Sequence, residues 1–135
     1  RSNALISQVD IYASLAGLVQ QNLGKGEAVD SLDMMDAFLG KTQSARTYLL
    51  EESVGTVALR KNNWKYIQPI APDKALPGWL ANKDIEMGFE STPQLFDLTD
   101  DTGEQTNLAE NYPQLVKELE MKTQSLVKKG FRNVQ

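Results

Sequence analysis

The sequence contains neither cysteine nor histidine among its 135 residues. Without cysteine, disulfides, thiolate metal sites and cysteine nucleophiles are excluded. Without histidine, the commonest general base and metal ligand near neutral pH is missing. Zinc sites of the usual kind and catalytic arrangements of the Ser-His-Asp or Cys-His type are therefore excluded as well. Any catalysis by this chain would have to depend on carboxylates, lysine, tyrosine or serine.

Long apolar runs and basic clusters are missing too. No apolar run approaches the roughly 18 residues that a transmembrane helix needs, so we expect no membrane partner. The net charge is −4, and no basic cluster is longer than two residues. A protein that binds the phosphate backbone needs a basic stripe, so we expect no nucleic acid partner either.

The remaining composition is that of a globular protein. Hydrophobic residues make up 41% of the chain and charged residues 24%, both usual proportions. The length suits one domain with a modest core. Residues 1–4 contain Ser-Asn-Ala, which resembles an expression-tag scar, and we exclude them from the fold prediction.

Residues 5–24 are predicted to contain a helix. Ser7 and Asp10 have the spacing of an N-terminal capping box. Gly17 could end the helix, but Gly24 is the preferred end. Apolar residues recur between them at helical spacing. They are Val9, Tyr12, Leu15, Ala16 and Val19.

A second, shorter helix is predicted to begin at Asp30-Ser31 and to end at Gly40. Its apolar residues would share one face of the helix. They are Leu32, Met35, Phe38 and Leu39.

Three strands are predicted next, at residues 47–53, 56–61 and 64–68. Asn62-Asn63 forms a two-residue hairpin turn, because asparagine tolerates positive φ. This turn places Lys61 opposite Trp64 and Leu59 opposite Tyr66. One face then carries apolar and aromatic side chains, namely Val57, Leu59, Trp64 and Tyr66. The other face, with Ala58, Arg60, Lys65 and Ile67, would be the solvated side of the sheet.

The last third of the chain contains a long connection at 69–92, a short strand at 95–98, a polar turn region at 99–107 and a helix. Pro113 suits the first position of that helix, and Gly130 closes it. Its apolar stripe comprises Leu115, Val116, Leu119, Thr123, Leu126 and Val127. The pattern predicts an α+β fold, with an antiparallel sheet of about four strands covered by the C-terminal helix and preceded by an N-terminal helical segment.

Four segments in order resemble the C-terminal region of sulfatases. Residues 94–109, QLFDLTDDTGEQTNLA, are similar to ELYDLxxDPxExxNLA, and residues 58–67, ALRKNNWKYI, are similar to A[IL]RxGxWK[YL]I. In the second pattern Asn63 replaces the turn glycine. Residues 30–41, DSLDMMDAFLGK, followed by Arg46, resemble DSxxxLPxLLGK, and residues 9–15, VDIYASL, resemble VD[IL]xPTL. The resemblance extends over residues 8–129.

The resemblance implies the C-terminal region of a sulfuric ester hydrolase of the alkaline-phosphatase superfamily. It divides the chain into a helical junction segment from the catalytic domain side at 5–45, a C-terminal subdomain at 46–130 and a tail at 131–135. The upstream catalytic domain of the same protein would then be the partner of this chain. A periplasmic or secreted location is implied by the family alone.

The family's chemistry is expected outside this chain. The resemblance implies a formylglycine made within a C/S-x-P-x-R motif, a calcium ion, and histidine and lysine residues around the sulfate. The nearest motif here, Ser91-Thr92-Pro93-Gln94-Leu95, has leucine where arginine is required. The acidic segment from Asp97 to Glu104 lacks the spacing of a calcium loop. We therefore expect no catalytic residue, metal ligand or cofactor in this chain, with calcium and formylglycine in the parent protein.

The long connection is the candidate rim of a substrate site. Lys74 and Lys83 would meet anionic groups of a sulfated small molecule or glycan, and Trp79 would stack on a sugar ring. An ordinary surface loop with Trp79 in the core is the alternative. The apolar stripe in residues 5–24 also suggests weak self-association when its domain partner is missing.

Two other functions remain open at this point. The chain could be the tail of a related phosphonate or phosphate monoester hydrolase, or a free-standing, non-enzymatic interaction module that uses the sheet face. A C/S-x-P-x-R segment upstream in the parent gene would separate these alternatives from a sulfatase.

Overall fold

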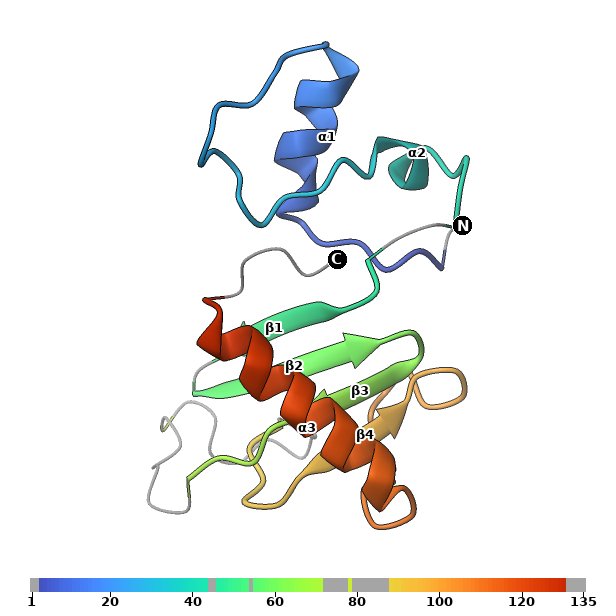
Figure 1. Cartoon of the computed structure of the whole chain (residues 1–135). Helices are drawn as coiled ribbons and strands as arrows, with labels where there is room; N and C mark the ends of the chain where they lie inside the picture. Colours follow the sequence, from blue (N-terminus) through green and yellow to red (C-terminus); the bar gives the residue numbers. More distant parts are fainter. Residues whose placement is uncertain (1–2, 44–45, 54, 72–77, 79–87, 131–135) are drawn as a thin grey trace. The chain divides into compact units, whose positions relative to one another are not determined.

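The computed structural model describes residues 3–43, 46–53, 55–71, 78 and 88–130. The chain is an α+β protein with a four-stranded antiparallel sheet, as predicted (Figure 1). The elements in order are α1 (Asp10–Leu18), α2 (Met35–Phe38), β1 (Leu49–Ser53), β2 (Thr56–Lys61), β3 (Trp64–Ile67), β4 (Gln94–Asp97) and α3 (Pro113–Lys128).

The chain forms two compact units. The first comprises Arg1–Leu49 and Leu126–Gln135, and the second comprises Leu50–Ser125. The domain boundary expected between residues 45 and 46 stays a prediction. None of the helices in the described part of the chain is long and apolar enough to cross a membrane.

The sheet has the strand order β1-β2-β3-β4. Lys61 lies opposite Trp64 and Leu59 opposite Tyr66, which confirms the predicted hairpin register. The positive φ of the turn, 53°, belongs to Asn62. The expectation that Asn63 replaces the turn glycine was therefore wrong, because Asn62 is the residue that takes the left-handed conformation.

Helix α1 is shorter than predicted. It ends at Leu18, and Gln20 then adopts a φ of 57°. The N–H of Gln20 donates to the carbonyl of Gly17 (3.1 Å) and that of Gln21 to the carbonyl of Ala16 (2.8 Å), which is a Schellman ending. Neither glycine ends the helix, so both predicted stops were wrong. Gly17 lies inside α1, where a Cβ would collide with the Asp33 carboxylate.

Helix α2 begins later than predicted, at Met35 rather than at Asp30-Ser31. The Asp33 carboxylate accepts a hydrogen bond from the N–H of Met35 (3.0 Å). Gly40, with a φ of 70°, ends α2 as predicted.

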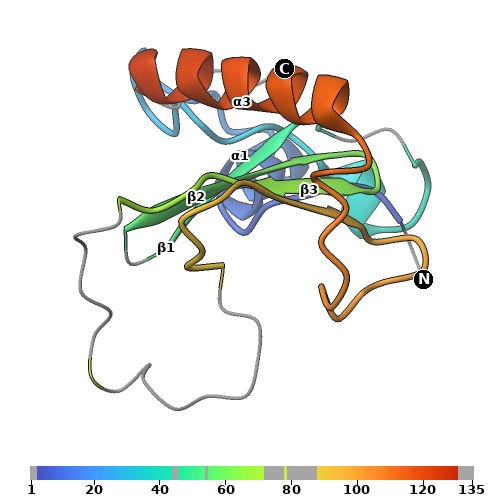
Figure 2. The ribbon, with the colours of Figure 1, turned by 90° about the horizontal axis from the view of Figure 1, so that it is seen from below.

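Helix α3 packs along one face of the sheet (Figure 2). Leu59, Tyr66 and Leu95 on that face are fully buried, and so is Leu119 of α3. The Trp64 ring lies 5.1 Å from the ring of Tyr112, just before the helix. The predicted start at Pro113 is confirmed. Val127, expected in the apolar stripe, is instead exposed.

The opposite face of the sheet is also largely buried. Ala58 and Ile67, which we expected on a solvated side, pack with Phe96 of β4 and with Leu98. Phe96 lies opposite Lys65 in the register, so β4 adds a large aromatic side chain to this face. The prediction was wrong there because it considered the β2–β3 hairpin without its third neighbour.

We predict that Leu119→Ala lowers the free energy of unfolding by about 2–5 kcal/mol, because it truncates a fully buried leucine. Met121→Ala, on the same helix but 56% exposed, is the matched control and should change it by less than about 0.5 kcal/mol. Denaturant unfolding followed by circular dichroism measures both. Equal midpoints for the two variants would show that α3 is not docked through Leu119.

We predict that Tyr66→Phe preserves stability at neutral pH and protects it in alkali. None of the described residues provides a hydrogen-bond partner for the buried Tyr66 hydroxyl. Removing that hydroxyl should change the free energy of unfolding by less than about 1 kcal/mol.

Burial, and then the charge of Glu120, raise the pKa of Tyr66 from 10.0 to about 12. The wild type should therefore lose stability as the pH rises from 10 towards 12, since ionisation then favours the unfolded chain. Unfolding curves at a series of pH values measure this difference. An identical alkaline profile for Tyr66→Phe and wild type would contradict the assignment.

Candidate functional site

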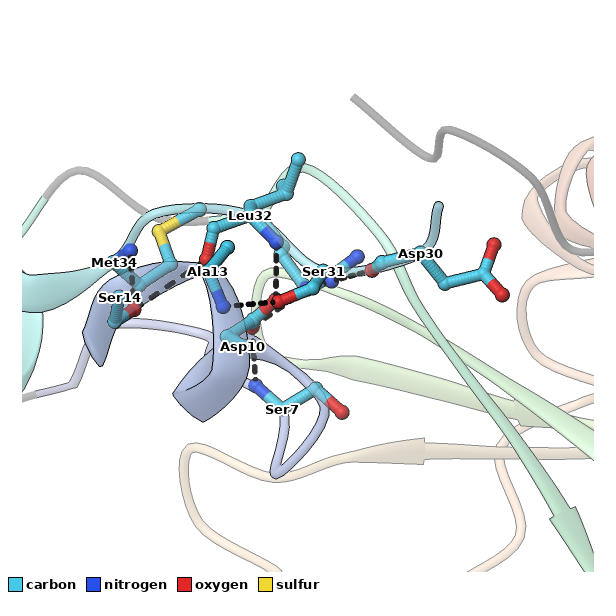
Figure 3. Close-up of polar contacts among 9 residues, drawn as sticks. Ser7, Asp10, Ala13, Ser14, Asp30, Ser31, Leu32 and Met34 are labelled. Atoms are coloured by element: carbon cyan, nitrogen blue, oxygen red, sulfur yellow. Dashed lines mark hydrogen bonds and ion pairs between the residues drawn. The ribbon is translucent and has the colours of Figure 1, made fainter. Parts of the chain in front are cut away.

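Asp10 is the central residue of a buried polar network in the first unit. Its side chain is fully buried, at the first position of α1. The N–H of Ser7 donates to Asp10 Oδ2 (2.8 Å), and the N–H of Leu32 donates to Oδ1 (3.0 Å) (Figure 3). The predicted capping box, with Ser7 as N-cap, was wrong, because the N-cap of α1 is Val9 and no side chain caps the helix.

Arg46 neutralises this buried carboxylate. Its Nε donates to Asp10 Oδ2 (2.8 Å), and its Nη2 donates to Asp10 Oδ1 and to the main-chain carbonyl of Asp30. The pair is bidentate, which suits the planar guanidinium. Burial raises the pKa of Asp10, but hydrogen bonds from Arg46, Leu32 and Ser7 outweigh it, so the pKa lies below its ordinary value.

Two serines complete the network. Ser31 Oγ accepts a hydrogen bond from the N–H of Ala13 (2.9 Å). Ser14 Oγ accepts one from the N–H of Met34 (2.8 Å) and donates to the carbonyl of Leu32 (3.4 Å). Figure 3 shows these contacts along the side of α1 that faces residues 31–34. The segment after α1 is therefore held to the helix by side-chain oxygens.

The network joins two of the four recognised segments. Asp10 belongs to VDIYASL, Ser31 belongs to DSLDMM, and Arg46 follows the latter. The sequence interpretation assigned Asp10 only a capping role and assigned no contact to Arg46. An acidic residue inside an apolar helical pattern was the available signal, because a carboxylate at such a position requires a partner. The network holds the segment at 31–34 and Arg46 to α1.

We predict that Asp10→Asn lowers the free energy of unfolding by about 3–5 kcal/mol at pH 7, because it leaves the buried Arg46 guanidinium without a counter-charge. Asp36→Asn is the matched control: it breaks the Asp36–Lys41 pair (3.3 Å), in which both side chains are more than 60% exposed. That loss should be below about 1 kcal/mol. Thermal unfolding measures both.

The same ion pair predicts a pH dependence. Because the pKa of Asp10 is lowered in the folded state, its contribution is complete above the unfolded value of about 3.9 and is lost as the pH falls below it. The wild type should lose this part of its stability in acid, whereas Asp10→Asn should not. Parallel acid profiles for the two proteins would contradict the assignment.

Asn107 organises the strongest family motif, in the second unit. Its Oδ1 accepts hydrogen bonds from the N–H groups of Leu95 (3.0 Å) and Ala109 (3.0 Å), and its Nδ2 donates to the carbonyl of Pro93 (3.2 Å). The N–H of Leu108 donates to the carbonyl of Leu95 (2.7 Å). One amide thus joins β4 to the turn that precedes α3.

The acidic residues of the motif form turns. Asp97 Oδ1 accepts from the N–H of Thr99 (3.0 Å), and the Asp101 carboxylate accepts from the N–H groups of Gln105 (3.0 Å) and Thr106 (2.8 Å). Hydrogen bonds from the side chain and the backbone N–H of Thr99 lower the pKa of Asp97. Within the described residues, no three carboxylates gather closely enough to hold a metal ion.

The formylglycine group does not fit the residues present. Ser91-Thr92-Pro93 leads into β4, and Leu95, at the position that would need arginine, is a fully buried strand residue. The backbone of Pro93 accepts from Asn107 in the motif described above. This segment therefore belongs to the packing of the sheet, and no catalytic step is assigned to it.

A cavity of about 420 Å³ lies against the sheet face that carries Ala58 and Ile67. Glu51, Glu52 and Glu104 contribute carboxylates to its lining, and Lys65 Nζ pairs with Glu104 (2.7 Å). Among the described residues that line the cavity, acidic groups outnumber this paired lysine, so this lining does not suit a sulfated ligand. The expected rim residues, Lys74, Trp79 and Lys83, lie outside the described residues.

Comparison with known proteins identifies the region. No protein-family model matches the chain. An N-acetylgalactosamine-6-O-sulfatase of Bacteroides thetaiotaomicron is 38% identical over 120 residues, 88% of this chain and 23% of that protein. Arylsulfatase K of Bos taurus is 31% identical over 136 residues, 93% of this chain and 22% of that protein. The chain is the C-terminal region of a sulfatase. It spans less than a quarter of the length of these two relatives.

Solved structures support this conclusion. A sulfatase structure from work on glycosaminoglycan metabolism by Bacteroides thetaiotaomicron has a TM-score of 0.78 at 38% identity, over 91% of this sulfatase region and 25% of that chain. The crystal structure of Ps i-CgsB in complex with k-i-k-neocarrahexaose has a TM-score of 0.60 at 18% identity, over 90% and 24% of the two chains. The second likeness shows the fold alone.

Proposed function

We propose that the whole protein hydrolyses sulfate esters and that this region has a structural role in it. The observation that carries the proposal is the 38% identity to an N-acetylgalactosamine-6-O-sulfatase, which extends over 88% of the chain. Both named relatives are sulfatases, and both are more than four times as long as the matching part. The catalytic domain of such proteins lies upstream of this region.

The chemistry of the site is proposed to lie in that upstream domain. A formylglycine and a calcium ion would serve there, since this chain has no cysteine or histidine and its Ser91-Thr92-Pro93 segment lacks the arginine. Calcium prefers oxygen ligands, and the Asp97 and Asp101 carboxylates in this region are already bonded to backbone N–H groups. Their contribution is to fix turns.

A sulfated glycan is the proposed substrate class, because the 38% identical relative is an N-acetylgalactosamine-6-O-sulfatase. The connection that contains Lys74, Trp79 and Lys83 is the part of this chain proposed to border the substrate. Two cations and an indole ring have the chemistry to bind a sulfated sugar. The acidic cavity on the sheet face does not have that chemistry.

We predict that the full-length protein releases sulfate from a chromogenic aryl sulfate and that the purified 135-residue chain does not, with or without calcium. Sulfated and desulfated N-acetylgalactosamine oligosaccharides then test the substrate class. Lys74→Ala and Lys83→Ala should raise KM with a smaller effect on kcat if these lysines border the site. Lys25→Ala, outside this connection, is the control.

Two results would overturn the proposal. One is turnover by the isolated chain that survives repurification and disappears in a point variant. The other is a full-length protein that cleaves phosphonate or phosphate monoesters but no sulfate ester.

A further inference from the structure

The turn before α3 carries an exposed aromatic ring. The Trp64 ring of β3 and the Tyr112 ring have their centroids 5.1 Å apart, with an angle of 58° between their planes. This tilted arrangement is favourable for two aromatic rings, so the half-buried Trp64 holds Tyr112 in place. Tyr112 is nevertheless 46% exposed. The second unit therefore presents an oriented aromatic ring to the solvent.

A cavity of about 520 Å³ lies beside the same turn, and we call it the turn cavity. Asn111 and Pro113, the two sequence neighbours of Tyr112, both line it. Thr92 and Pro93, which lead into β4, line it as well. Its volume is within the range of small-molecule sites, roughly 300–1,000 Å³. An oriented aromatic ring and a cavity of ligand size are thus carried by one short segment.

The wall of the turn cavity is held by hydrogen bonds within the chain. The side-chain amide of Asn107 bonds to the carbonyl of Pro93 (3.2 Å) and to the N–H of Ala109 (3.0 Å), and all three residues line the cavity. The N–H of Asn111 donates to the carbonyl of Leu108 (3.0 Å). Because this backbone is ordered before a ligand arrives, binding has a smaller entropic cost.

The lining of the turn cavity suits a neutral, polar ligand. Thr92 supplies a hydroxyl, Asn111 an amide and Glu110 a carboxylate, and all three residues are exposed. These groups can donate and accept several hydrogen bonds, while Val116 adds an apolar contact. Among the described residues of the lining, Glu110 is the only charged one. A carboxylate repels another anion, so a sulfate group is not the ligand here.

We propose that the turn cavity and the Tyr112 ring bind an uncharged sugar unit of a glycan. One face of a sugar ring consists of C–H groups, which pack on an aromatic ring, and its hydroxyl groups bond to amides and carboxylates. The choice of ligand rests on the proposed function, because an enzyme that acts on a sulfated glycan also meets the unsulfated units of the same chain. The site would hold such a unit.

Titration of the 135-residue chain with a sugar tests the assignment without any measurement of turnover. The sequence contains two tryptophans, so Trp79→Phe leaves Trp64 as the only indole. Because Trp64 contacts Tyr112, its fluorescence should change saturably as a chemically desulfated N-acetylgalactosamine oligosaccharide is added. We expect a Kd on the order of 1 mM, which corresponds to one packed ring and a few hydrogen bonds. Ligand-detected NMR measures the same Kd without the indole.

Two variants and a matched control locate the site. Tyr112→Ala should raise the Kd about tenfold, because it removes the packed ring. Glu110→Gln should raise it about fivefold, because a neutral amide replaces a charged acceptor. Tyr12→Ala, which removes a 57% exposed tyrosine of the first unit, should leave the Kd unchanged. Glu110→Gln changes an exposed side chain, so it keeps the test decisive if Tyr112→Ala also lowers the unfolding midpoint.

Three results would refute the sugar site: no binding at millimolar probe, a Kd that neither Tyr112→Ala nor Glu110→Gln changes, or tighter binding of the sulfated oligosaccharide at Trp64. Binding that disappears in Trp79→Phe would place the sugar at Trp79 and refute it as well. A full-length protein that releases no sulfate, together with the expected titration, would refute the proposed function and leave the sugar site intact.

Discussion

The first unit depends on one buried ion pair. Asp10 has no contact with solvent, and its charge is tolerable only because Arg46, from 36 residues further along the chain, meets it with two nitrogens. Removal of a carboxylate from water costs several kcal/mol, so the partner must be present and correctly oriented. The same guanidinium binds the carbonyl of Asp30. One residue, Arg46, thus contacts both α1 and the segment after it.

In the second unit, the side-chain amide of Asn107 holds separate backbone segments together, as the ion pair does in the first. Asn107 satisfies backbone groups on both sides of the turn between β4 and α3. Asp101 satisfies two further N–H groups within that turn. The side chains that make this region recognisable as part of a sulfatase are therefore occupied by the folding of its backbone. This explains how a motif can identify the family through the folding of its backbone.

Helix α1 has a polar side and an apolar side. Polar residues of α1 face inward to the network, which leaves its apolar residues outward. The acidic cavity on the sheet face is a separate feature, with a charge that does not suit a sulfated ligand.

The sequence alone determined what depends on neighbouring residues: the hairpin register around Asn62, the start of α3 at Pro113 and the family motifs. It also excluded sites that need cysteine or histidine, since the sequence contains neither residue. Tertiary structure decided which faces are buried. Periodicity shows that Val9 and Leu15 share a side of α1 but not what covers that side. The sequence also does not predict the contact between Asp10 and Arg46, because two residues so far apart in the chain leave no local pattern.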